Sequence, residues 1–209
     1  MAQYFSIHPT HPQPRLIAQA ARIVREGGVI AYPTDSCYAI GCHIGDKDAQ
    51  EKLRRLREID DRHHLTLVCR DLSEIATYAR IDNACYRLLK KLTPGSYTFL
   101  LEATREVPKR LLHARRKTIG IRVPDHPVVL ALLAELKEPI LSATALLPGE
   151  DQPVSDAHEL RERWEHELDL VMDAGTCGIV PTTVLDLTGP EIVVVRPGRG
   201  DLGALGIQA

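Results

Sequence analysis

The sequence predicts a single α/β domain, spanning residues 1–209, built on a mixed β-sheet with flanking helices. Short apolar runs, typical of buried strands, occur between segments in which apolar residues recur at helical spacing. Strands and helices do not alternate strictly, which favours a mixed sheet over a regular doubly wound fold. No linker, repeat or low-complexity segment divides the chain, so we expect one domain.

The predicted helices share apolar residues at helical spacing, and they span 16–25, 47–58, 72–78, 84–92, 126–136 and 156–167. The first stops at Gly27-Gly28, a pair that terminates helices. The helix at 126–136 has Pro127 in its first turn, and we expect Asp125 to cap it.

The predicted strands are short and rich in Val, Ile and Leu, and they span 29–32, 65–69, 97–102, 118–123, 139–145, 168–172, 183–187 and 192–195. Thr93-Pro-Gly95 is a turn that leads into the strand at 97–102. The last two strands flank Gly189-Pro190, which predicts a closing hairpin.

Composition excludes several classes of protein. The chain has 209 residues, 44% hydrophobic and 4% aromatic, so aliphatic side chains must fill its core. Its formal net charge of -2 gives no argument from the whole chain for a nucleic-acid binder. The five cysteines include no CxxC pair, and no Cys and His residues stand at zinc spacing, so we expect no structural metal. Without a signal peptide or a long apolar span, we expect a cytoplasmic protein that does not contact membranes.

Two strands are predicted to end on an arginine, in Thr118-Ile-Gly-Ile-Arg122 and Ile192-Val-Val-Val-Arg196. A buried arginine stays charged and needs an anion beside it. The partner could be one of the carboxylates Asp125, Asp173 or Asp186, or a bound phosphate or carboxylate. A third strand stops at Pro33-Thr34-Asp35 and offers a hydroxyl. These strand ends predict a pocket for an anionic ligand.

Phosphate loops of the usual kinds are absent from the sequence. It has no Gly-x-Gly-x-x-Gly and no Walker-type loop. It also lacks a Gly-x-Ser-x-Gly elbow, which argues against an α/β-hydrolase. Two regions are locally basic, with side chains Arg54, Arg55, Arg57, Arg62, His63, His64 and Arg70 in the first and Lys109, Arg110, His113, Arg115, Arg116 and Lys117 in the second. Such runs are either solvated faces or phosphate-binding surfaces.

Motifs across nearly the whole chain resemble those of the YrdC/YciO family. The longest is Gly27-Gly-Val-Ile-Ala-Tyr-Pro-Thr-Asp-Ser-Cys-Tyr-Ala-Ile-Gly-Cys42. The others follow in family order, as Thr93-Pro-Gly95, Ile119-Gly-Ile-Arg-Val-Pro-Asp-His-Pro127, Leu141-Ser-Ala-Thr144, Asp173-Ala-Gly175, Pro181-Thr-Thr-Val-Leu-Asp186 and Val195-Arg-Pro-Gly198. The YciO branch is the most similar, because its members share the Ile-His-Pro segment near the N-terminus and the stretch seen here at Arg116 to Gly120.

The resemblance implies a twisted mixed sheet with a large, basic, concave cavity. Synthases of the family use ATP, L-threonine and bicarbonate to make threonylcarbamoyl-AMP for tRNA modification, and release pyrophosphate. It therefore implies ATP with Mg²⁺ as substrates and a small amino acid as the acceptor. Family members are also reported to bind RNA, so double-stranded RNA or tRNA is the alternative partner, without catalysis.

Site residues follow from the same resemblance, position by position. It places Thr34, Tyr38, Arg122 and Thr182 at the amino acid and its adenylate. Ser142, Thr144 and Arg196 are implied to bind the nucleotide, and Arg57 is the candidate catalytic cation.

Two synthase signatures are altered here. The Lys-x-Arg-Pro signature aligns with Arg57-Glu-Ile-Asp60, so Ile59 replaces an arginine. The Ser-x-Asn signature aligns with Thr144-Ala-Leu146, so Leu146 replaces an amide. Losing one positioned polar group at a developing charge costs about a hundred- to thousand-fold in rate. Two such losses argue against efficient synthase activity, unless Arg62, His63 or His64 supplies the missing group.

Overall fold

The computed structural model describes residues 1–60, 65–112 and 117–205. Its strands are β1 (Gln3–Ser6), β2 (Ile30–Tyr32), β3 (Ala39–His43), β4 (Thr66–Val68), β5 (Tyr97–Glu102), β6 (Thr118–Arg122), β7 (Ile140–Thr144), β8 (Leu170–Asp173), β9 (Thr183–Asp186) and β10 (Val193–Arg196). Its α-helices are α1 (Pro14–Arg25), α2 (Lys47–Arg57), α3 (Leu72–Tyr78), α4 (Asn83–Leu92), α5 (Pro127–Leu136) and α6 (Ala157–Arg163). Short 3₁₀ helices span Lys109–Leu111 and Gly203–Leu205.

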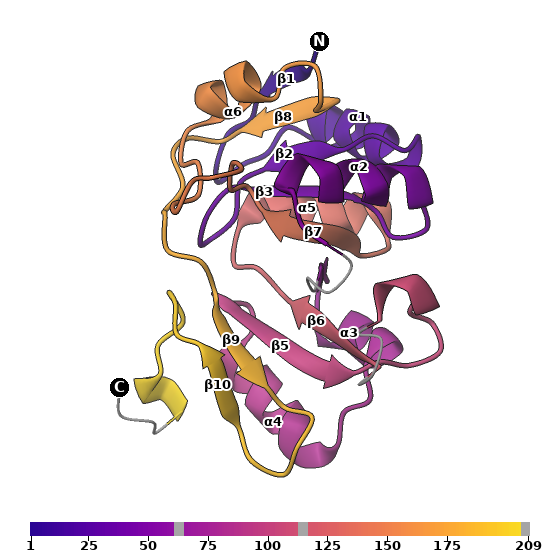
Figure 1. Cartoon of the computed structure of the whole chain (residues 1–209), viewed down its shortest axis with the longest axis vertical. Helices are drawn as coiled ribbons and strands as arrows, with labels where there is room; N and C mark the ends of the chain where they lie inside the picture. Colours follow the sequence, from indigo (N-terminus) through magenta and orange to yellow (C-terminus); the bar gives the residue numbers. More distant parts are fainter. Residues whose placement is uncertain (61–64, 113–116, 206–209) are drawn as a thin grey trace.

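All of the described strands join one mixed sheet, in the order β1-β8-β2-β3-β7-β4-β6-β5-β9-β10. Four neighbouring pairs are parallel and five are antiparallel, which confirms the predicted mixed sheet. Figure 1 shows β1, β8, β2, β3 and β7 in the upper half and β6, β5, β9 and β10 in the lower half. The short strand β4 joins the two halves, because it pairs with both β7 and β6.

Helices cover the upper half on both faces. On one face α1 and α5 pack together, and α1 buries Ile17, Ala20 and Val24 at helical spacing. The helix ends before Gly27, whose φ of 88° is the left-handed conformation that glycine adopts without strain, as the sequence predicted. On the other face α2 packs against β3 and β7 (Figure 1).

The structure differs from the local predictions in two missed strands, one helix cap and one helix end. The strands β1 and β3 were not predicted, because neither β1 nor the mixed Ala39–His43 run reads as a continuous Val- and Ile-rich segment. The cap of α5 is His126, whose Nδ1 accepts a hydrogen bond from the backbone N–H of Val128 at 3.3 Å; Asp125 does not cap it. The charged helix predicted for 156–167 ends at Arg163.

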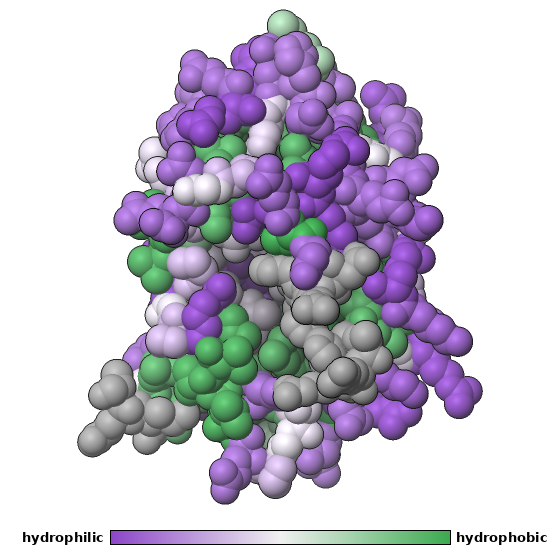
Figure 2. Space-filling view, in the orientation of Figure 1, coloured by the Kyte–Doolittle hydropathy of each residue, from purple (hydrophilic) through white to green (hydrophobic). Residues whose placement is uncertain are grey.

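The strand β10 is not buried, contrary to the prediction for 192–195. It lies at the edge of the sheet and pairs with β9 alone among the described strands. Val193 and Val195 are more than half exposed. Figure 2 shows apolar side chains gathered on the part of the surface where Figure 1 places β9 and β10. The predicted hairpin of β9 and β10 is confirmed.

No described helix is both long and apolar enough to cross a membrane.

Candidate functional site

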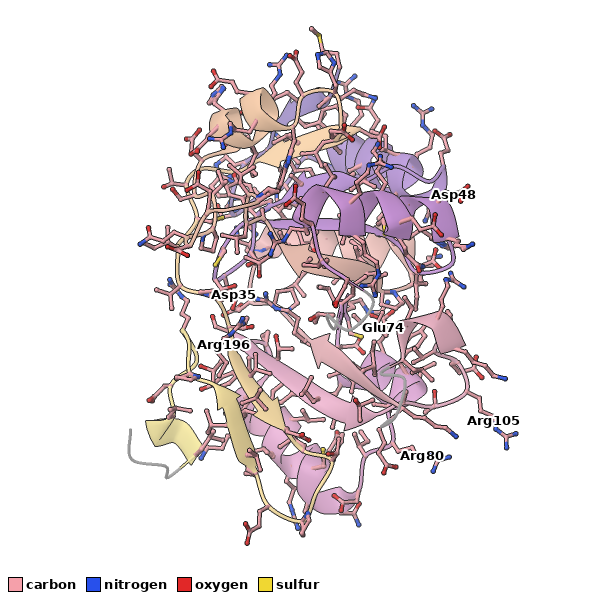
Figure 3. The ribbon with its side chains drawn as sticks, in the orientation of Figure 1. Asp35, Asp48, Glu74, Arg80, Arg105 and Arg196 are labelled. Carbon is pink, nitrogen blue, oxygen red and sulfur yellow. The ribbon has the colours of Figure 1, made fainter. Side chains whose placement is uncertain are left out.

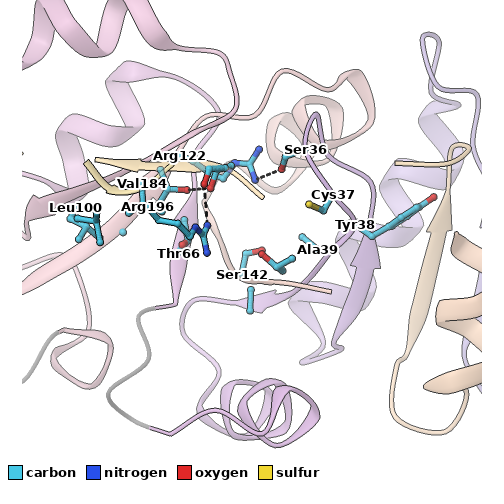
Figure 4. A pocket seen from close by; sticks show the side chains of 16 residues that line it. Ser36, Cys37, Tyr38, Ala39, Thr66, Leu100, Arg122, Ser142, Val184 and Arg196 are labelled. Carbon is cyan, nitrogen blue, oxygen red and sulfur yellow. Dashed lines mark hydrogen bonds between the residues drawn. The ribbon is translucent and has the colours of Figure 1, made fainter. Parts of the chain in front are cut away.

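A cavity of about 290 Å³ lies on the sheet where its two halves meet. Its described lining comes from β3, β4, β5, β6, β7, β9 and β10 and from the residues just before β3 and β9, and it contains two arginines, several hydroxyls and no carboxylate (Figure 4). The lining residues are Ser36, Cys37, Tyr38, Ala39, Thr66, Thr98, Leu100, Gly120, Arg122, Ser142, Ala143, Thr144, Thr182, Val184, Val195 and Arg196. Six of the predicted site residues therefore line the cavity: Tyr38, Arg122, Ser142, Thr144, Thr182 and Arg196.

Arg122, at the end of β6, is the buried cation of this cavity. It is 8% exposed, and its Nη2 lies 2.5 Å from Oδ1 of Asp35. Its Nη1 donates to the hydroxyl of Ser36 at 3.3 Å (Figure 4). Nε of Arg122 is buried and has no hydrogen-bond partner among the described residues. The protein thus neutralises Arg122 with Asp35, which none of the predicted pairings named, and leaves one donor unused.

Arg196, at the end of β10, is the second cation. It lies on the more exposed side of the cavity, and its Nη2 donates to the backbone oxygen of Thr182 at 3.1 Å. No carboxylate of the described residues forms an ion pair with it, so of the two predicted alternatives the bound anion stays open for Arg196. Figure 3 labels Arg196 and Asp35 at the level where the upper and lower halves meet. A guanidinium without a paired carboxylate remains available to an anionic ligand.

Three of the predicted hydroxyl residues, Ser142, Thr144 and Thr182, line the cavity. Ser142 on β7 accepts a hydrogen bond from Tyr32 at 2.6 Å and donates to the backbone oxygen of Ile40 at 3.2 Å. Thr182 shares a hydrogen bond of 2.8 Å with Thr98. Thr144 lies opposite Ala39 in the β3–β7 ladder. These hydroxyls are fixed by the sheet register, which suits them to positioning a ligand.

Thr34 and Tyr38 support the loop between β2 and β3. The hydroxyl of Thr34 donates to the backbone oxygen of Cys37 at 2.6 Å and accepts from the backbone N–H groups of Ser36 and Cys37. Thr34 is not part of the described cavity lining. The Tyr38 hydroxyl donates to the backbone oxygen of Gly175, and Figure 4 shows its ring directed away from the cavity. Direct contact of either residue with a ligand stays a prediction.

Arg57 stands at the end of α2, outside the described cavity lining. Its Nη1 donates to the backbone oxygen of Leu146, and its Nε is buried without a described partner. Partial burial lowers the pKa of Arg57 below its usual value. The two altered signatures therefore meet in space, because Arg57 belongs to one and Leu146 to the other. Its catalytic role stays a prediction.

Sequence reasoning missed several lining residues. Ser36, Thr66 and Thr98 come from the loop before β3 and from β4 and β5. Thr66 pairs with Ser142 on one side and Gly120 on the other, so all three lie in one row across the sheet. Only the strand order reveals this row, because β4 lies between β7 and β6.

Cys37 lines the cavity but is a poor nucleophile. Burial raises the pKa of its thiol, which keeps the thiol protonated at neutral pH. The described residues contain no group of three His, Cys, Asp or Glu side chains that could hold a metal ion.

The basic regions are only partly described, because 62–64 and 113–116 lie outside the described residues. Four of the described cations have acceptors within the protein: Arg54 donates to the backbone oxygen of Asp60, Arg55 pairs with Glu167, Arg70 with Asp71, and Arg110 donates to Gln50. RNA binding stays a prediction.

A second, larger groove of about 600 Å³ lies between the start of α4 and the connection from β9 to β10. None of the predicted site residues lines it, and its charged groups Arg80, Asp82, Glu102 and Glu191 are exposed. The smaller cavity is therefore the candidate site.

Comparisons with known proteins identify the family of the chain. The family model Sua5_yciO_yrdC, described as "Telomere recombination", matches residues 22–198. The protein YciO of Escherichia coli (strain K12) is 54% identical over 202 residues, which cover 97% of this chain and 98% of that protein. The crystal structure of E. coli YciO superposes with a TM-score of 0.94 and covers 98% of this chain and 99% of that one.

Some more distant relatives are named as enzymes. The threonylcarbamoyl-AMP synthase of Bacillus subtilis (strain 168) is 31% identical over 188 residues, covering 87% of this chain but only 53% of the synthase. The crystal structure of Pyrococcus abyssi Sua5 complexed with L-threonine has a TM-score of 0.86 at 25% identity, covering 93% of this chain and 57% of Sua5. This chain spans about half the length of these two relatives. By its family match, its fold and its similarity to YciO, the chain belongs to the Sua5/YciO/YrdC family.

Proposed function

We propose that this chain binds ATP and a small amino acid in the cavity on its sheet and catalyses slow formation of an N-carbamoyl adenylate such as threonylcarbamoyl-AMP. One observation carries the proposal: two arginines and a row of hydroxyls surround a cavity whose described lining contains no carboxylate. Such a lining suits ligands with several negative charges. The synthase relatives and the threonine-bound Sua5 structure supply the reaction class.

The chemistry asks the protein mainly to hold two anions together. Bicarbonate and the amine of threonine condense to a carbamate with loss of water, and a carbamate oxygen then attacks the α-phosphorus of ATP. A new P–O bond forms, the bond to the β-phosphate oxygen breaks, and pyrophosphate leaves with the electron pair. Positioning of the anions and neutralisation of the developing charge supply the catalysis, so no covalent nucleophile is needed.

The arginines have different places in this scheme. Arg122 has a free, buried Nε and is already neutralised by Asp35, which suits it to donate a hydrogen bond to a carbamate or α-phosphate oxygen. Arg196 has no carboxylate partner among the described residues, which suits it to a phosphate with full negative charge. Magnesium would enter with ATP as part of the substrate, since the described lining offers it no carboxylate.

Two substitutions make the reaction slow. Ile59 and Leu146 stand at signature positions where the synthases place polar groups. Arg57, beside them, donates to the main chain of Leu146 and not into the described cavity. The cavity therefore keeps its anion-binding groups, whereas Arg57 makes a structural contact with the main chain of Leu146.

The test is incubation of the purified chain with ATP, Mg²⁺, bicarbonate and labelled L-threonine, followed by assay of pyrophosphate and adenylated threonine. We expect both products, at rates well below those of a synthase run in parallel. Arg196→Ala should abolish them, whereas Arg105→Ala, which removes an exposed arginine outside the cavity, should leave the rate unchanged. No product from the wild-type chain while the synthase works would refute the threonine reaction.

A further inference from the structure

The hydroxyl of Ser142 forms two hydrogen bonds, to Tyr32 and to the backbone of Ile40, and neither of these residues belongs to the described cavity lining. Tyr32 Oη lies 2.6 Å from Ser142 Oγ, and Ser142 Oγ lies 3.2 Å from the backbone oxygen of Ile40. Tyr32 is fully buried, and Ser142 is 5% exposed and lines the cavity, where Figure 4 labels it.

The direction of both bonds follows from counting donors and acceptors. A carbonyl oxygen cannot donate, so Ser142 supplies the proton of its bond to Ile40. Tyr32 must then donate to Ser142, because the serine has a single proton. The opposite arrangement would leave the proton of a fully buried tyrosine without an acceptor, which is unfavourable. Burial also raises the pKa of Tyr32 to about 12, so this donor stays protonated at neutral pH.

We propose that Ser142 Oγ acts toward the cavity as a hydrogen-bond acceptor only, and that it selects ligands bearing an N–H donor at that point. A serine oxygen has two lone pairs, of which Tyr32 uses one, so one remains for the ligand. Ser142 therefore cannot donate to a phosphate or carboxylate oxygen, and its role differs from that of the arginines. The inference rests on the proposed function, because it assumes that ATP and an amino acid enter this cavity.

The hydroxyl pair of Thr98 and Thr182 provides the contrast. The two oxygens lie 2.8 Å apart, and either can be the donor, so this pair can adjust to a donor or to an acceptor. Ser142, in contrast, has a fixed polarity, and the residue that fixes it, Tyr32, lies outside the described cavity lining.

Two parts of the proposed substrates carry an N–H donor: the amine of the amino acid and the exocyclic amine of adenine. Each can be tested against an analogue that lacks only that amine. The first pair is L-threonine and β-hydroxybutyrate, and the second is ATP and purine riboside triphosphate. Isothermal titration of each ligand gives the preference for the amine within each pair.

Two variants distinguish the effect of the Ser142 oxygen on binding from the effect of removing the Tyr32 hydroxyl. Tyr32→Phe removes the tyrosine hydroxyl but keeps Ser142 Oγ. Tyr32→Phe/Ser142→Ala removes both partners together, which avoids the orphaned buried hydroxyl that Ser142→Ala alone would create.

We expect the wild-type chain and Tyr32→Phe to prefer the amine-bearing ligand in one of the two pairs, and that pair identifies the source of the donor. The double variant should lose about tenfold in affinity for the amine-bearing ligand and bind its analogue unchanged. Retention of the preference by the double variant, or an equal loss for ligand and analogue, would overturn the inference alone. No binding of ATP or threonine to the wild-type chain would overturn the proposed function together with it.

Discussion

Nη2 of Arg122 lies 2.5 Å from Oδ1 of Asp35, and the other carboxylate oxygen of Asp35 accepts a hydrogen bond from Ser96 at 2.6 Å. Asp35 belongs to the loop between β2 and β3, Ser96 precedes β5, and Arg122 ends β6. One carboxylate therefore ties the upper half of the sheet to the lower half beside the cavity. The same contact fixes the position of the Arg122 side chain at the cavity.

Breaking this ion pair should destabilise the fold. Both side chains are only 10% exposed, so Asp35→Asn would leave the charge of Arg122 buried without compensation. We expect a loss of about 3–5 kcal/mol in the free energy of unfolding. Urea unfolding measures it, with Asp125→Asn as the control, because that carboxylate is exposed and its removal should change stability by about 0.5 kcal/mol or less. Equal midpoints for the two variants would contradict the structural role of Asp35.

His126 should make the stability of the fold depend on pH. Its Nδ1 caps α5 only when unprotonated, and burial lowers its pKa below the ordinary value of 6.5. The unfolded chain therefore binds a proton more readily than the folded chain, so stability is complete above pH 6.5 and falls as the pH decreases below it. His126→Asn keeps a capping side chain that does not titrate.

Unfolding free energies between pH 5 and 7.5 test this linkage. We expect the curve of His126→Asn to be flatter than that of the wild-type chain. Two parallel curves would show that His126 does not contribute.

The five thiols should react slowly in the folded protein. Burial raises the pKa of each one, that of Cys42 to about 12 and that of Cys177 to about 11. Iodoacetamide at pH 8 should therefore modify the native chain far more slowly than the chain unfolded in guanidinium, as mass spectrometry can measure. If the folded protein reacts as fast as the unfolded one, burial does not raise the pKa of these thiols.

The same raised thiol pKa values predict weaker folding at alkaline pH. Above the ordinary thiol pKa of 9.0 the unfolded chain loses protons that the folded chain retains, so the unfolding free energy falls as the pH increases from 9 toward 11. A stability that increases over this range would have the wrong sign.

Restoring the two altered signatures should accelerate the proposed reaction. Ile59→Arg with Leu146→Asn returns the polar groups of the synthases to positions beside Arg57. We expect pyrophosphate release to increase by about a hundred- to thousand-fold. Ile59→Gln with Leu146→Asn is the matched control, because it adds polarity without the charge and should recover less activity. No gain from the charged pair would show that these positions do not limit the rate.

Much of the fold could be predicted from local patterns. The apolar spacing of α1, its stop at Gly27 and the β9–β10 hairpin around Gly189-Pro190 are all confirmed. Neighbouring residues within each segment create these features, so the sequence alone contains them. The strand β3 was missed because Gly41 and His43 interrupt its apolar run, and pairing with β2 and β7 makes it a strand.

The site could be predicted only in its residue types. Strand-end arginines and family motifs indicated Arg122, Arg196, Ser142 and Thr182, and the structure brings them to one cavity. The partner of Arg122 could not be found this way, because Asp35 is 87 residues away and meets it only through the order of the strands.

The sequence by itself determined that the chain forms a mixed α/β sheet and that its strand ends carry cations and hydroxyls. Tertiary structure alone decided which cation is neutralised, since pairing of Arg122 with Asp35 and exposure of Arg196 at an edge strand both depend on non-local strand order. It also decided the polarity of Ser142, because a hydroxyl points its proton according to neighbours that the fold supplies, here Tyr32 and Ile40.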